Sequence, residues 1–372
     1  MIIFNEPLVL GSEQLFVQKV MDKEYFCGNG KFSHLCETEL TKIFQVQKVL
    51  LTSSCSAAMS IVADLIDIQP DDEIIIPAFA HVGTASAFAA RKAKIVWCDI
   101  ESGSRNLNID LLPELITDKT KALVVVHYAG ISCDMNILTA FCLSNSILLI
   151  EDNAQGIGAS YQGKSLGSYG DLAVTSFHQT KNIHCGEGGA LIINSPDFID
   201  KAQMIRDRGT DRKSFNQGEI DRWRWQTSGT NCYLSELQAA FLYAQIHELP
   251  KVNAHRIALF EYYNLLLKDI LPPENLPQVL SESKPNGHCF SILTKSEKQR
   301  INIINSLRKE GVQSAFHYQP LHKAPFWKGL YDKLTLPETE NVAQTILRLP
   351  MHYNLKLKDI EFICKKVEKV YE

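Results

Sequence analysis

Short apolar runs that alternate with helix-like stretches fill the first half of the chain, and they restrict the possible folds more than any other feature. Seven runs look like strands, namely KVLLTSS (48–54), DEIIIPA (72–78), AKIVWCDI (93–100), KALVVVHYAG (121–130), SILLIED (146–152), LAVTSF (172–177) and GALIIN (189–194). They are continuously apolar rather than alternating, which is typical of strands covered on both faces. Plausible helices lie between several of them, such as SAAMSIVADLID, VGTASAFAARK and ILTAFCLSN. This pattern predicts an α/β fold with a mainly parallel sheet, whose ligands gather at the carboxyl ends of the strands.

The pattern changes after residue 195 and predicts a second, smaller unit. Helical segments are expected over 196–208, over LSELQAAFLYAQIHEL up to Pro250, and over 252–267. HCFSILT then predicts a strand, and SEKQRINIINSLRKEG predicts an amphipathic helix that ends at Gly311. A chain of 372 residues is too long for most single cores. We therefore expect a large α/β domain over residues 1–250 and a smaller C-terminal α/β domain over 251–372.

The composition argues against several classes of protein. A formal net charge of −4 is unlike the basic surplus of nucleic-acid binders. No apolar run approaches the roughly 20 residues of a membrane span, and the opening MIIFNEPLVLGSEQ lacks the pattern of a secretory signal. The ten cysteines are scattered, with no zinc-knuckle spacing, so reduced thiols are the simplest explanation. We expect a cytoplasmic protein without nucleic acid, membrane or metal partners.

Small residues lead directly from the first predicted strand into a helix at VLLTSSCSAAM. Free backbone N–H groups and the helix dipole at such a start form an anion site that suits a phosphate. An ordinary N-cap by Ser53, Ser54 or Ser56 explains the same residues, and it is the favoured explanation when this segment is considered alone.

A carboxylate stands at the tip of the fifth predicted strand, where SILLIEDNAQG places Asp152. A carboxylate at such a position needs a partner, because an unpaired buried charge is costly. A protonated heteroaromatic nitrogen is one such partner, and a helix cap or a structural ion pair explains Asp152 equally well. Gln155 follows three residues later and could face the same ligand.

One lysine follows the sixth predicted strand within SFHQTKNIHCGEGG (176–189). Most lysines are solvated surface charges. In a partly desolvated pocket, however, Lys181 would have a lowered pKa, and its neutral amine could form a Schiff base. Ser176 could donate to the same phosphate as the helix start, and the glycine cluster would let the backbone pass close to a ligand. Pyridoxal phosphate (PLP) carries a phosphate, a pyridine nitrogen and an aldehyde, so this one ligand explains all three anchors.

The order of these segments resembles the DegT/DnrJ/EryC1 family of nucleotide-sugar aminotransferases. The matching motifs are TSSCSAAM, PAFAHVGTASAF, VHYAGISCDM, IEDNAQGIGASYQGKSLGSYGD, SFHQTKN, GEGGALI, YLSELQAA and FHYQPLH. They run through nearly the whole chain, and SFHxTKN followed by GEGG is a specific signal. The resemblance implies PLP as cofactor and the PLP-dependent transferase fold type I, which is aspartate aminotransferase-like.

The resemblance also implies roles for individual residues near the cofactor. Lys181 corresponds to the Schiff-base lysine, and Asp152 corresponds to the acid that pairs with the pyridine nitrogen. Gln155 occupies the position that approaches the cofactor's 3-hydroxyl. Cys55 and Ser56 match the phosphate-binding turn.

Further family positions surround this centre. Ser176 would assist in holding the phosphate. His81 stands where members usually carry Phe, Trp or Tyr to stack on the cofactor ring; an imidazole is flat but offers less apolar area, so a role turned away from the ring is also open. Asn231 matches an asparagine that reaches the phosphate from the neighbouring subunit, which implies a homodimer with shared active sites. The sugar pocket is implied to include His317, Tyr318 and His322.

Within the family, FNEPLV, YFCGNGKF and WRW…SGTNCYLSELQAA resemble members that aminate C4 of dTDP-4-keto-6-deoxy-D-glucose with L-glutamate. Such an enzyme gives dTDP-4-amino-4,6-dideoxy-D-galactose and 2-oxoglutarate for a surface glycan such as lipopolysaccharide or enterobacterial common antigen. Amination at C3 stays open. A dehydratase is disfavoured because that branch replaces the lysine with histidine, and Lys181 is present. A non-catalytic regulator that binds PLP or a sugar nucleotide is disfavoured because every chemical anchor is in place.

Overall fold

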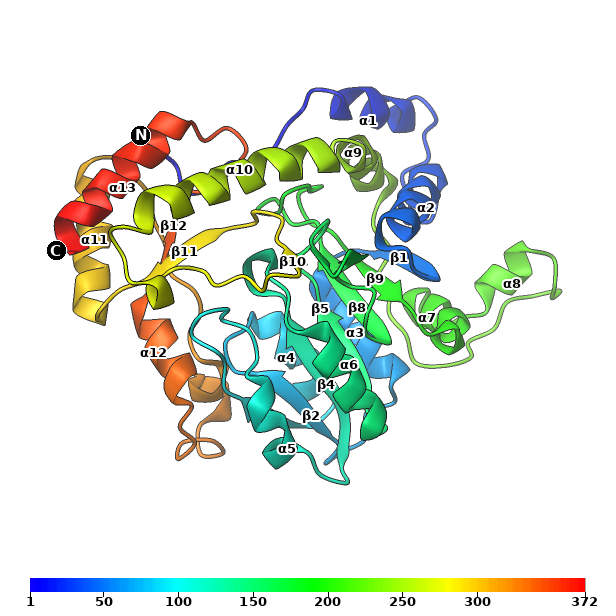
Figure 1. Cartoon of the computed structure of the whole chain (residues 1–372). Helices are drawn as coiled ribbons and strands as arrows, with labels where there is room; N and C mark the ends of the chain where they lie inside the picture. Colours follow the sequence, from blue (N-terminus) through cyan, green and yellow to red (C-terminus); the bar gives the residue numbers. More distant parts are fainter. Residues whose placement is uncertain (372) are drawn as a thin grey trace.

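A computed structural model describes residues 1–371 of the chain, and all seven predicted strands form in it. They make one sheet in the order β1-β9-β8-β5-β4-β2-β3 (Figure 1). The strand bounds are β1 Lys48–Thr52, β2 Glu73–Pro77, β3 Lys94–Cys98, β4 Thr120–Val126, β5 Leu148–Asp152, β8 Leu172–Ser176 and β9 Gly189–Ile193. The five neighbouring strands β8, β5, β4, β2 and β3 run parallel to one another. β9 lies between β8 and β1 and is antiparallel to both. The expected mainly parallel α/β sheet is therefore confirmed.

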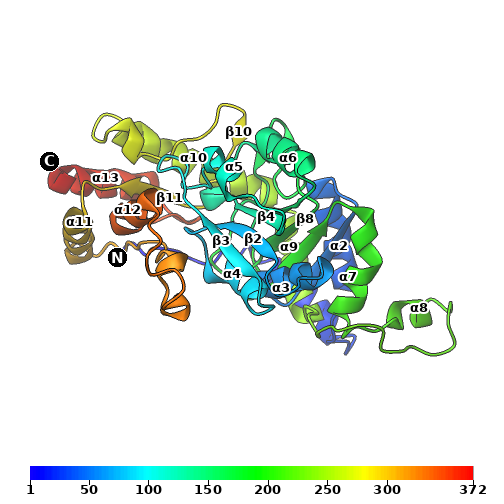
Figure 2. The same ribbon diagram turned by 90° about the horizontal axis from the view of Figure 1, so that it is seen from below.

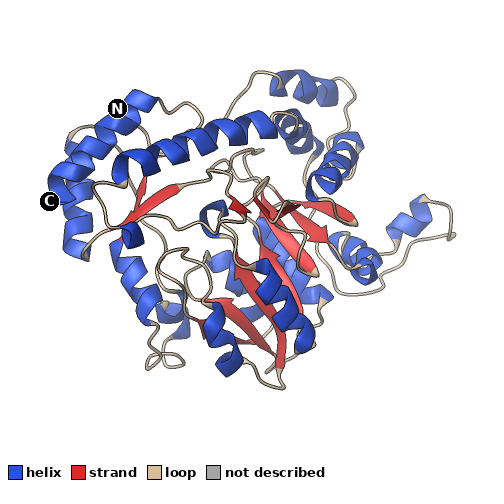
Figure 3. Cartoon of the chain, viewed as in Figure 1, coloured by secondary structure: helices blue, strands red, loops and turns tan. Residues whose placement is uncertain are grey.

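Helices cover both faces of this sheet, which explains why the strands are continuously apolar (Figure 3). In β2, Ile74 and Ile76 face a core with the helices of one side, and Ile75 between them faces the core of the other side. The first side carries α3 (Cys55–Leu65), α4 (Val82–Ala89) and α7 (Ile199–Arg206). The other side carries α2 (Lys31–Phe44), α5 (Leu112–Leu115), α6 (Met135–Ser144) and α9 (Glu236–Ile246), with α1 (Glu13–Met21) against α9.

The C-terminal part of the chain builds a separate apolar core beside the large sheet. Its elements are α10 (Leu249–Leu267), β11 (Phe290–Leu293), α11 (Glu297–Lys309), α12 (Pro337–Thr345), β12 (Ile346–Leu349) and α13 (Leu357–Tyr371). β11 and β12 pair antiparallel. Pro250 ends no helix here, because it lies in the first turn of α10, where the missing N–H costs no hydrogen bond. α10 thus begins three residues earlier than expected; the domain division at residue 250 stays a prediction.

Smaller elements were not predicted. β6 (Ser160–Tyr161), β7 (Lys164–Ser165) and β10 (Ser283–Lys284) form a three-stranded sheet. α8 (Arg212–Asn216) lies in the segment 207–231, and the part of this segment around α8 projects from the body of the molecule in both views (Figures 1 and 2). Short 3-10 turns occur at Ile109–Leu111, Tyr128–Gly130, Pro196–Phe198, Pro273–Asn275, Leu321–Lys323 and Pro325–Trp327. Among residues 1–371, none of the helices combines the length and apolar character that a bilayer span requires.

Candidate active site

A cavity of about 470 Å³ opens at the carboxyl ends of the parallel strands, where the sequence predicts a ligand. Its wall includes the start of α3, the last residues of β4, β5 and β8, and the loop before β9. The C-terminal part of the chain closes it with β12 and the segments around residues 288 and 317. The volume lies within the range of small-molecule sites, about 300–1,000 Å³.

Nine of the eleven residues expected at the site line this cavity. They are Cys55, Ser56, His81, Asp152, Gln155, Ser176, Lys181, His317 and Tyr318. The other two lie elsewhere in this single chain. Asn231 is exposed on the projecting segment, and His322 is buried with its Nε2 3.0 Å from Glu340 Oε1 on α12. The roles assigned to these two residues stay predictions.

The first turn of α3 forms the anion end of the cavity. Ser54 is the N-cap, and its Oγ accepts a hydrogen bond from Ala57 N at 3.0 Å, so this part of the N-cap explanation is right. The backbone N–H groups of Cys55 and Ser56 lie in the first turn and have no intrahelical partner. A Cβ added at Gly189 would lie 2.3 Å from Cys55 N, so glycine lets β9 approach the helix start. This glycine thus allows close packing of protein backbone rather than of a ligand.

Asp152 ends β5 and is held by two hydrogen bonds. Its Oδ2 accepts from the Thr84 hydroxyl at 2.6 Å, and its Oδ1 accepts from Ala154 N at 3.1 Å. Only 6% of Asp152 is exposed, yet it lines the cavity. No cation contacts this carboxylate in the part of the chain that the structure describes, so neither a helix cap alone nor an ion pair accounts for it.

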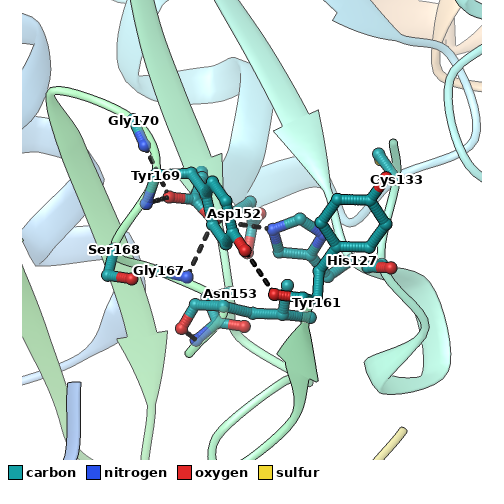
Figure 4. Close-up of polar contacts among 12 residues, drawn as sticks. His127, Cys133, Asp152, Asn153, Tyr161, Gly167, Ser168, Tyr169 and Gly170 are labelled. Atoms are coloured by element: carbon teal, nitrogen blue, oxygen red, sulfur yellow. Dashed lines mark hydrogen bonds and ion pairs between the residues drawn. The ribbon is translucent and has the colours of Figure 1, made fainter. Parts of the chain in front are cut away.

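The neighbouring carboxylate, Glu151, directly precedes Asp152 on β5, and because side chains alternate along a strand it lies on the opposite face of the sheet, the face of Leu149. Figure 4 shows its partners His127, Gly167, Tyr169 and Gly170 gathered at the strand end. Glu151 is fully buried and accepts hydrogen bonds of 2.7 Å from the backbone N–H groups of Gly167, Tyr169 and Gly170. The fully buried His127 lies 2.9 Å away through Nε2. Burial alone would raise the pKa of Glu151, but these hydrogen bonds outweigh it and lower the pKa. The network fixes the backbone from which Asp152 projects.

Lys181 brings an amine into the cavity from the loop between β8 and β9. Desolvation is the largest influence on this group and lowers its pKa from the ordinary value. Cys55 and Asp152 oppose that effect, while Arg348 adds to it. Lys181 and Asp152 thus line the same cavity, as the sequence hypothesis requires.

Gln155 and two stacked rings form the wall beside Asp152. The Gln155 Oε1 accepts from Ala129 N at 2.8 Å, and its Nε2 donates to the Tyr318 hydroxyl at 3.0 Å. The rings of His317 and Tyr318 stack with centroids 4.1 Å apart and planes 9° apart. The oxygen and the nitrogen of the Gln155 amide are thus both engaged, and the side chain keeps a fixed orientation toward the cavity.

His81 caps α4 at the cavity edge. Its Nδ1 accepts a hydrogen bond of 3.0 Å from Gly83 N. Desolvation is the main cause that lowers the pKa of His81, which favours the neutral ring. Its ring centroid lies 6.3 Å from that of Tyr318, at an angle of 72°. The cap fixes the ring, and whether it also stacks on the cofactor stays a prediction.

The sequence reasoning missed several residues of the cavity wall, including Thr84, whose hydroxyl orients Asp152. Phe4 and Asn5 come from the N-terminal segment, and no local pattern marks them. His288 is buried, with its Nδ1 3.2 Å from Asn182 Oδ1. Arg348 interrupts the apolar run ILRLPM on β12. A charged residue within a buried strand is a usable signal, and it was overlooked.

PLP fits this cavity. The start of α3 offers free N–H groups for a phosphate, Asp152 offers an acceptor for a ring nitrogen, and Lys181 offers an amine with a lowered pKa. All three groups meet in one enclosed space at the predicted sheet edge. The described residues hold no cluster of three or more potential metal ligands.

Comparisons with known proteins agree with this geometry. The DegT/DnrJ/EryC1/StrS aminotransferase family matches residues 11–368. A dTDP-4-dehydro-2,3,6-trideoxy-D-glucose 4-aminotransferase from Saccharopolyspora spinosa is 27% identical over 379 aligned positions, which cover 100% of this chain and 97% of that protein. PseC from Helicobacter pylori, an aminotransferase involved in the biosynthesis of pseudoaminic acid, is 26% identical with a TM-score of 0.91 over 100% of this chain and 99% of that chain.

The fold itself is shared with a further solved structure. The putative sugar aminotransferase Spr1654 from Streptococcus pneumoniae, in its PLP form, has a TM-score of 0.90 at 23% identity and covers 99% of this chain and 98% of its own. The family match, the relatives and the fold together identify fold type I and a PLP-dependent enzyme. The chain belongs to the DegT/DnrJ/EryC1/StrS family and is a PLP-dependent sugar aminotransferase.

Proposed function

We propose that this enzyme transfers the amino group of L-glutamate to C4 of dTDP-4-keto-6-deoxy-D-glucose. The products are dTDP-4-amino-4,6-dideoxy-D-galactose, for a surface glycan, and 2-oxoglutarate. The observation that carries the proposal is the meeting of Lys181, Asp152 and the start of α3 in one cavity. Motif similarity supports C4 amination, and so does a 27% identical relative whose name specifies amination of a dTDP-linked trideoxy keto sugar at C4.

Different residues of this chain would bind different parts of PLP. The N–H groups of Cys55 and Ser56, with Ser176, would hold the phosphate of PLP. Asp152, oriented by Thr84, would accept a hydrogen bond from the protonated ring nitrogen. When bound, PLP supplies an aldehyde that carries the amino group and a ring that takes up the electrons of a breaking C–H bond.

Lys181 would move the protons. Because desolvation lowers its pKa, a larger share of the amine is neutral and able to act as a base. Its Nζ would remove a proton from the α-carbon of the amino donor in the first half of the reaction. In the second half, the same nitrogen would deliver a proton to C4 of the sugar. Lys181 would therefore act as a general base in the first half of the reaction and as a general acid in the second.

The proposal includes a homodimer in the cytoplasm. The segment 207–231 supports it, because its part with α8 projects from the body of the chain and its two tryptophans, Trp223 and Trp225, are exposed. Exposed aromatic side chains on an arm are typical of an interface. In the homodimer, the segment 207–231 would cover the active site of the partner subunit. Asn231 would then contact the phosphate of the PLP bound in that partner subunit.

The test is a reaction with defined substrates. Purified protein loaded with PLP is incubated with L-glutamate and dTDP-4-keto-6-deoxy-D-glucose, and the product is examined by NMR. We expect an axial amine at C4, as in the galactose configuration. An amine at C3, or an equatorial amine at C4, would overturn the product assignment and leave the aminotransferase intact. Absence of any amino sugar would overturn this sugar as the substrate and would also leave the aminotransferase assignment standing.

A further inference from the structure

His288 lines the active-site cavity with one ring nitrogen engaged and the other free. Its Nδ1 lies 3.2 Å from Asn182 Oδ1. Within residues 1–371 no donor contacts its Nε2, and this atom stays accessible although only 6% of His288 is exposed. Because the ring lines the cavity, Nε2 faces the space that the ligands occupy. The protonation of this atom therefore decides which ligand group it can meet.

The Asn182 side chain fixes which nitrogen of His288 carries the proton. Its amide nitrogen donates to the Asn286 carbonyl at 2.9 Å and to Asn253 Oδ1 at 2.8 Å. A backbone carbonyl only accepts, so the amide oxygen of Asn182 is the atom that faces His288. An amide oxygen also only accepts, and therefore Nδ1 of His288 donates to it. Arg256 fixes the backbone of this residue by donating to the carbonyl of His288 at 2.6 Å.

The ring of His288 is neutral. Desolvation is the main cause that lowers its pKa well below the ordinary value, and the nearby cation of Lys181 adds to it. Arg256 and Arg348 act in the same direction. Since the single proton is held on Nδ1, Nε2 carries a lone pair and no proton. His288 thus offers the cavity a hydrogen-bond acceptor that cannot donate.

The ligands of the proposed reaction bring few donors to such an acceptor. The phosphate of PLP and the carboxylates of L-glutamate are themselves acceptors at neutral pH. The ring nitrogen and the 3-hydroxyl of PLP are expected at Asp152 and Gln155, and the amino group of the donor is consumed by the transfer. The thymine and deoxyribose groups lie beyond the diphosphate at C1, across the sugar ring from C4. The hydroxyl groups of the sugar itself remain.

The position of Lys181 selects one of these hydroxyl groups. In the proposed function, Lys181 Nζ delivers a proton to C4 of the sugar, so C4 lies beside this amine. The charge of Lys181 lowers the pKa of His288, so the two side chains are neighbours on the cavity wall. In a 4-keto-6-deoxyhexose, C4 has two neighbours in the ring: C5 carries the methyl group, and C3 carries a hydroxyl. The hydroxyl nearest to the reacting carbon is therefore on C3.

We propose that His288, with its tautomer set by Asn182, accepts a hydrogen bond through Nε2 from the C3 hydroxyl of the sugar substrate. The identity of that sugar rests on the proposed function. The contact orients C4 toward Lys181 and makes the enzyme selective for 4-keto sugars that keep a hydroxyl on C3.

The test compares dTDP-4-keto-6-deoxy-D-glucose with its 3-deoxy analogue as amino acceptors for the holoenzyme, with L-glutamate as donor and 2-oxoglutarate release as the readout. The wild type should prefer the sugar with the 3-hydroxyl by about 10- to 100-fold in kcat/KM, the loss expected when a desolvated acceptor is left unpaired. His288→Phe should remove this preference. His288→Gln, whose amide oxygen can replace Nε2, should keep part of it. His255→Phe, on the exposed side of α10, is the matched control and should keep the wild-type preference.

A second measurement does not depend on turnover. dTDP-4,6-dideoxy-D-glucose has no ketone and cannot react, and its 3,4,6-trideoxy analogue lacks only the 3-hydroxyl in addition. Calorimetric titration of His255→Phe should give the first ligand a dissociation constant about tenfold lower than the second, whereas His288→Phe should bind both equally.

Two results would overturn the role of His288 and leave the proposed function intact. One is a preference for the 3-hydroxyl that survives in His288→Phe, and the other is equal use of the two keto sugars by the wild type. If the wild type aminates neither keto sugar, the sugar of the proposed function is wrong, and the contact proposed for His288 is wrong with it.

Discussion

The Thr84 hydroxyl donates a hydrogen bond of 2.6 Å to Asp152 Oδ2, which links the first turn of α4 to the end of β5. The bond leaves the carboxylate in one orientation at the cavity wall. Thr84→Val removes the donor at nearly constant volume, and Thr84→Ser keeps it. We expect Thr84→Val to raise the dissociation constant of PLP by about tenfold, or 1.4 kcal/mol, because one hydrogen bond to a charged group is lost. Equal affinities for the two variants, measured by fluorescence titration, would contradict a positioning role for Thr84.

Lys181→Ala should lose transamination by about 10³-fold or more, since both the covalent anchor and the acid–base group disappear. The visible absorption band of the holoenzyme should be absent, while far-UV circular dichroism stays unchanged. Lys201→Ala on α7 is the matched control, because Lys201 Nζ bonds only to a backbone carbonyl, that of Leu65, away from the cavity. A variant that lacks Lys181 but keeps the band would show that another amine holds the cofactor.

The charge neighbourhood of Lys181 predicts the sign of two further pKa changes. Desolvation lowers the pKa of this amine, Asp152 raises it and Arg348 lowers it. In the protein without PLP, Asp152→Asn should therefore lower the pKa of Lys181 further, and Arg348→Met should raise it. Competitive amine labelling at a series of pH values, with mass spectrometry of the Lys181 peptide, measures both shifts. Shifts of the opposite sign would mean that the three groups do not share one cavity.

Glu151 should matter for stability more than for chemistry, because it is fully buried and accepts from three backbone N–H groups and His127. Glu151→Gln places an amide donor against these donors and should lower the free energy of unfolding by about 2–4 kcal/mol. The native pKa of Glu151 is lowered, so its contribution is present above the unfolded pKa and is lost as the pH falls through the native value. Urea midpoints, with Glu368→Gln on the exposed face of α13 as control, measure the effect.

Much of the fold could be predicted from the sequence because its signals are local. Continuous apolar runs place all seven strands within a few residues, since both faces of the sheet are buried. The strands β6, β7 and β10 have two residues each, too few for any periodicity. Pro250 was interpreted as the end of one helix, although it starts the next, because proline suits both positions locally.

The residues of the candidate site likewise fall into those that local sequence signals predict and those that they do not. Lys181 and Asp152 follow strand ends, so parallel topology alone brings them to one edge of the sheet. His288 and Phe4 reach the cavity from segments far away in the chain, and only tertiary folding reveals them. Arg348 also comes from a distant segment, but its place within an apolar run is a signal in the sequence. Asn231 does not line the cavity of its own chain, so the role predicted for it requires a second subunit.

The shared-site dimer predicts a complementation result. Lys181→Ala and Asn231→Ala should each be weakly active alone. If Asn231 serves the partner's site, mixed dimers hold one site free of both changes, and an equal mixture after subunit exchange should recover about a quarter of the wild-type activity. No recovery in mixed dimers, whose formation is verified by native mass spectrometry, would mean that Asn231 acts within its own chain or not at all.

The most direct measurement of the central claim is the chemical capture of the cofactor. Holoenzyme reduced with borohydride and digested should carry the pyridoxyl phosphate mass on the peptide that contains Lys181, and Asp152→Asn should retain this label with an altered absorption spectrum. Attachment to a different lysine, or no attachment in a protein that aminates its sugar, would contradict the assignment of Lys181 and Asp152 to one catalytic cavity.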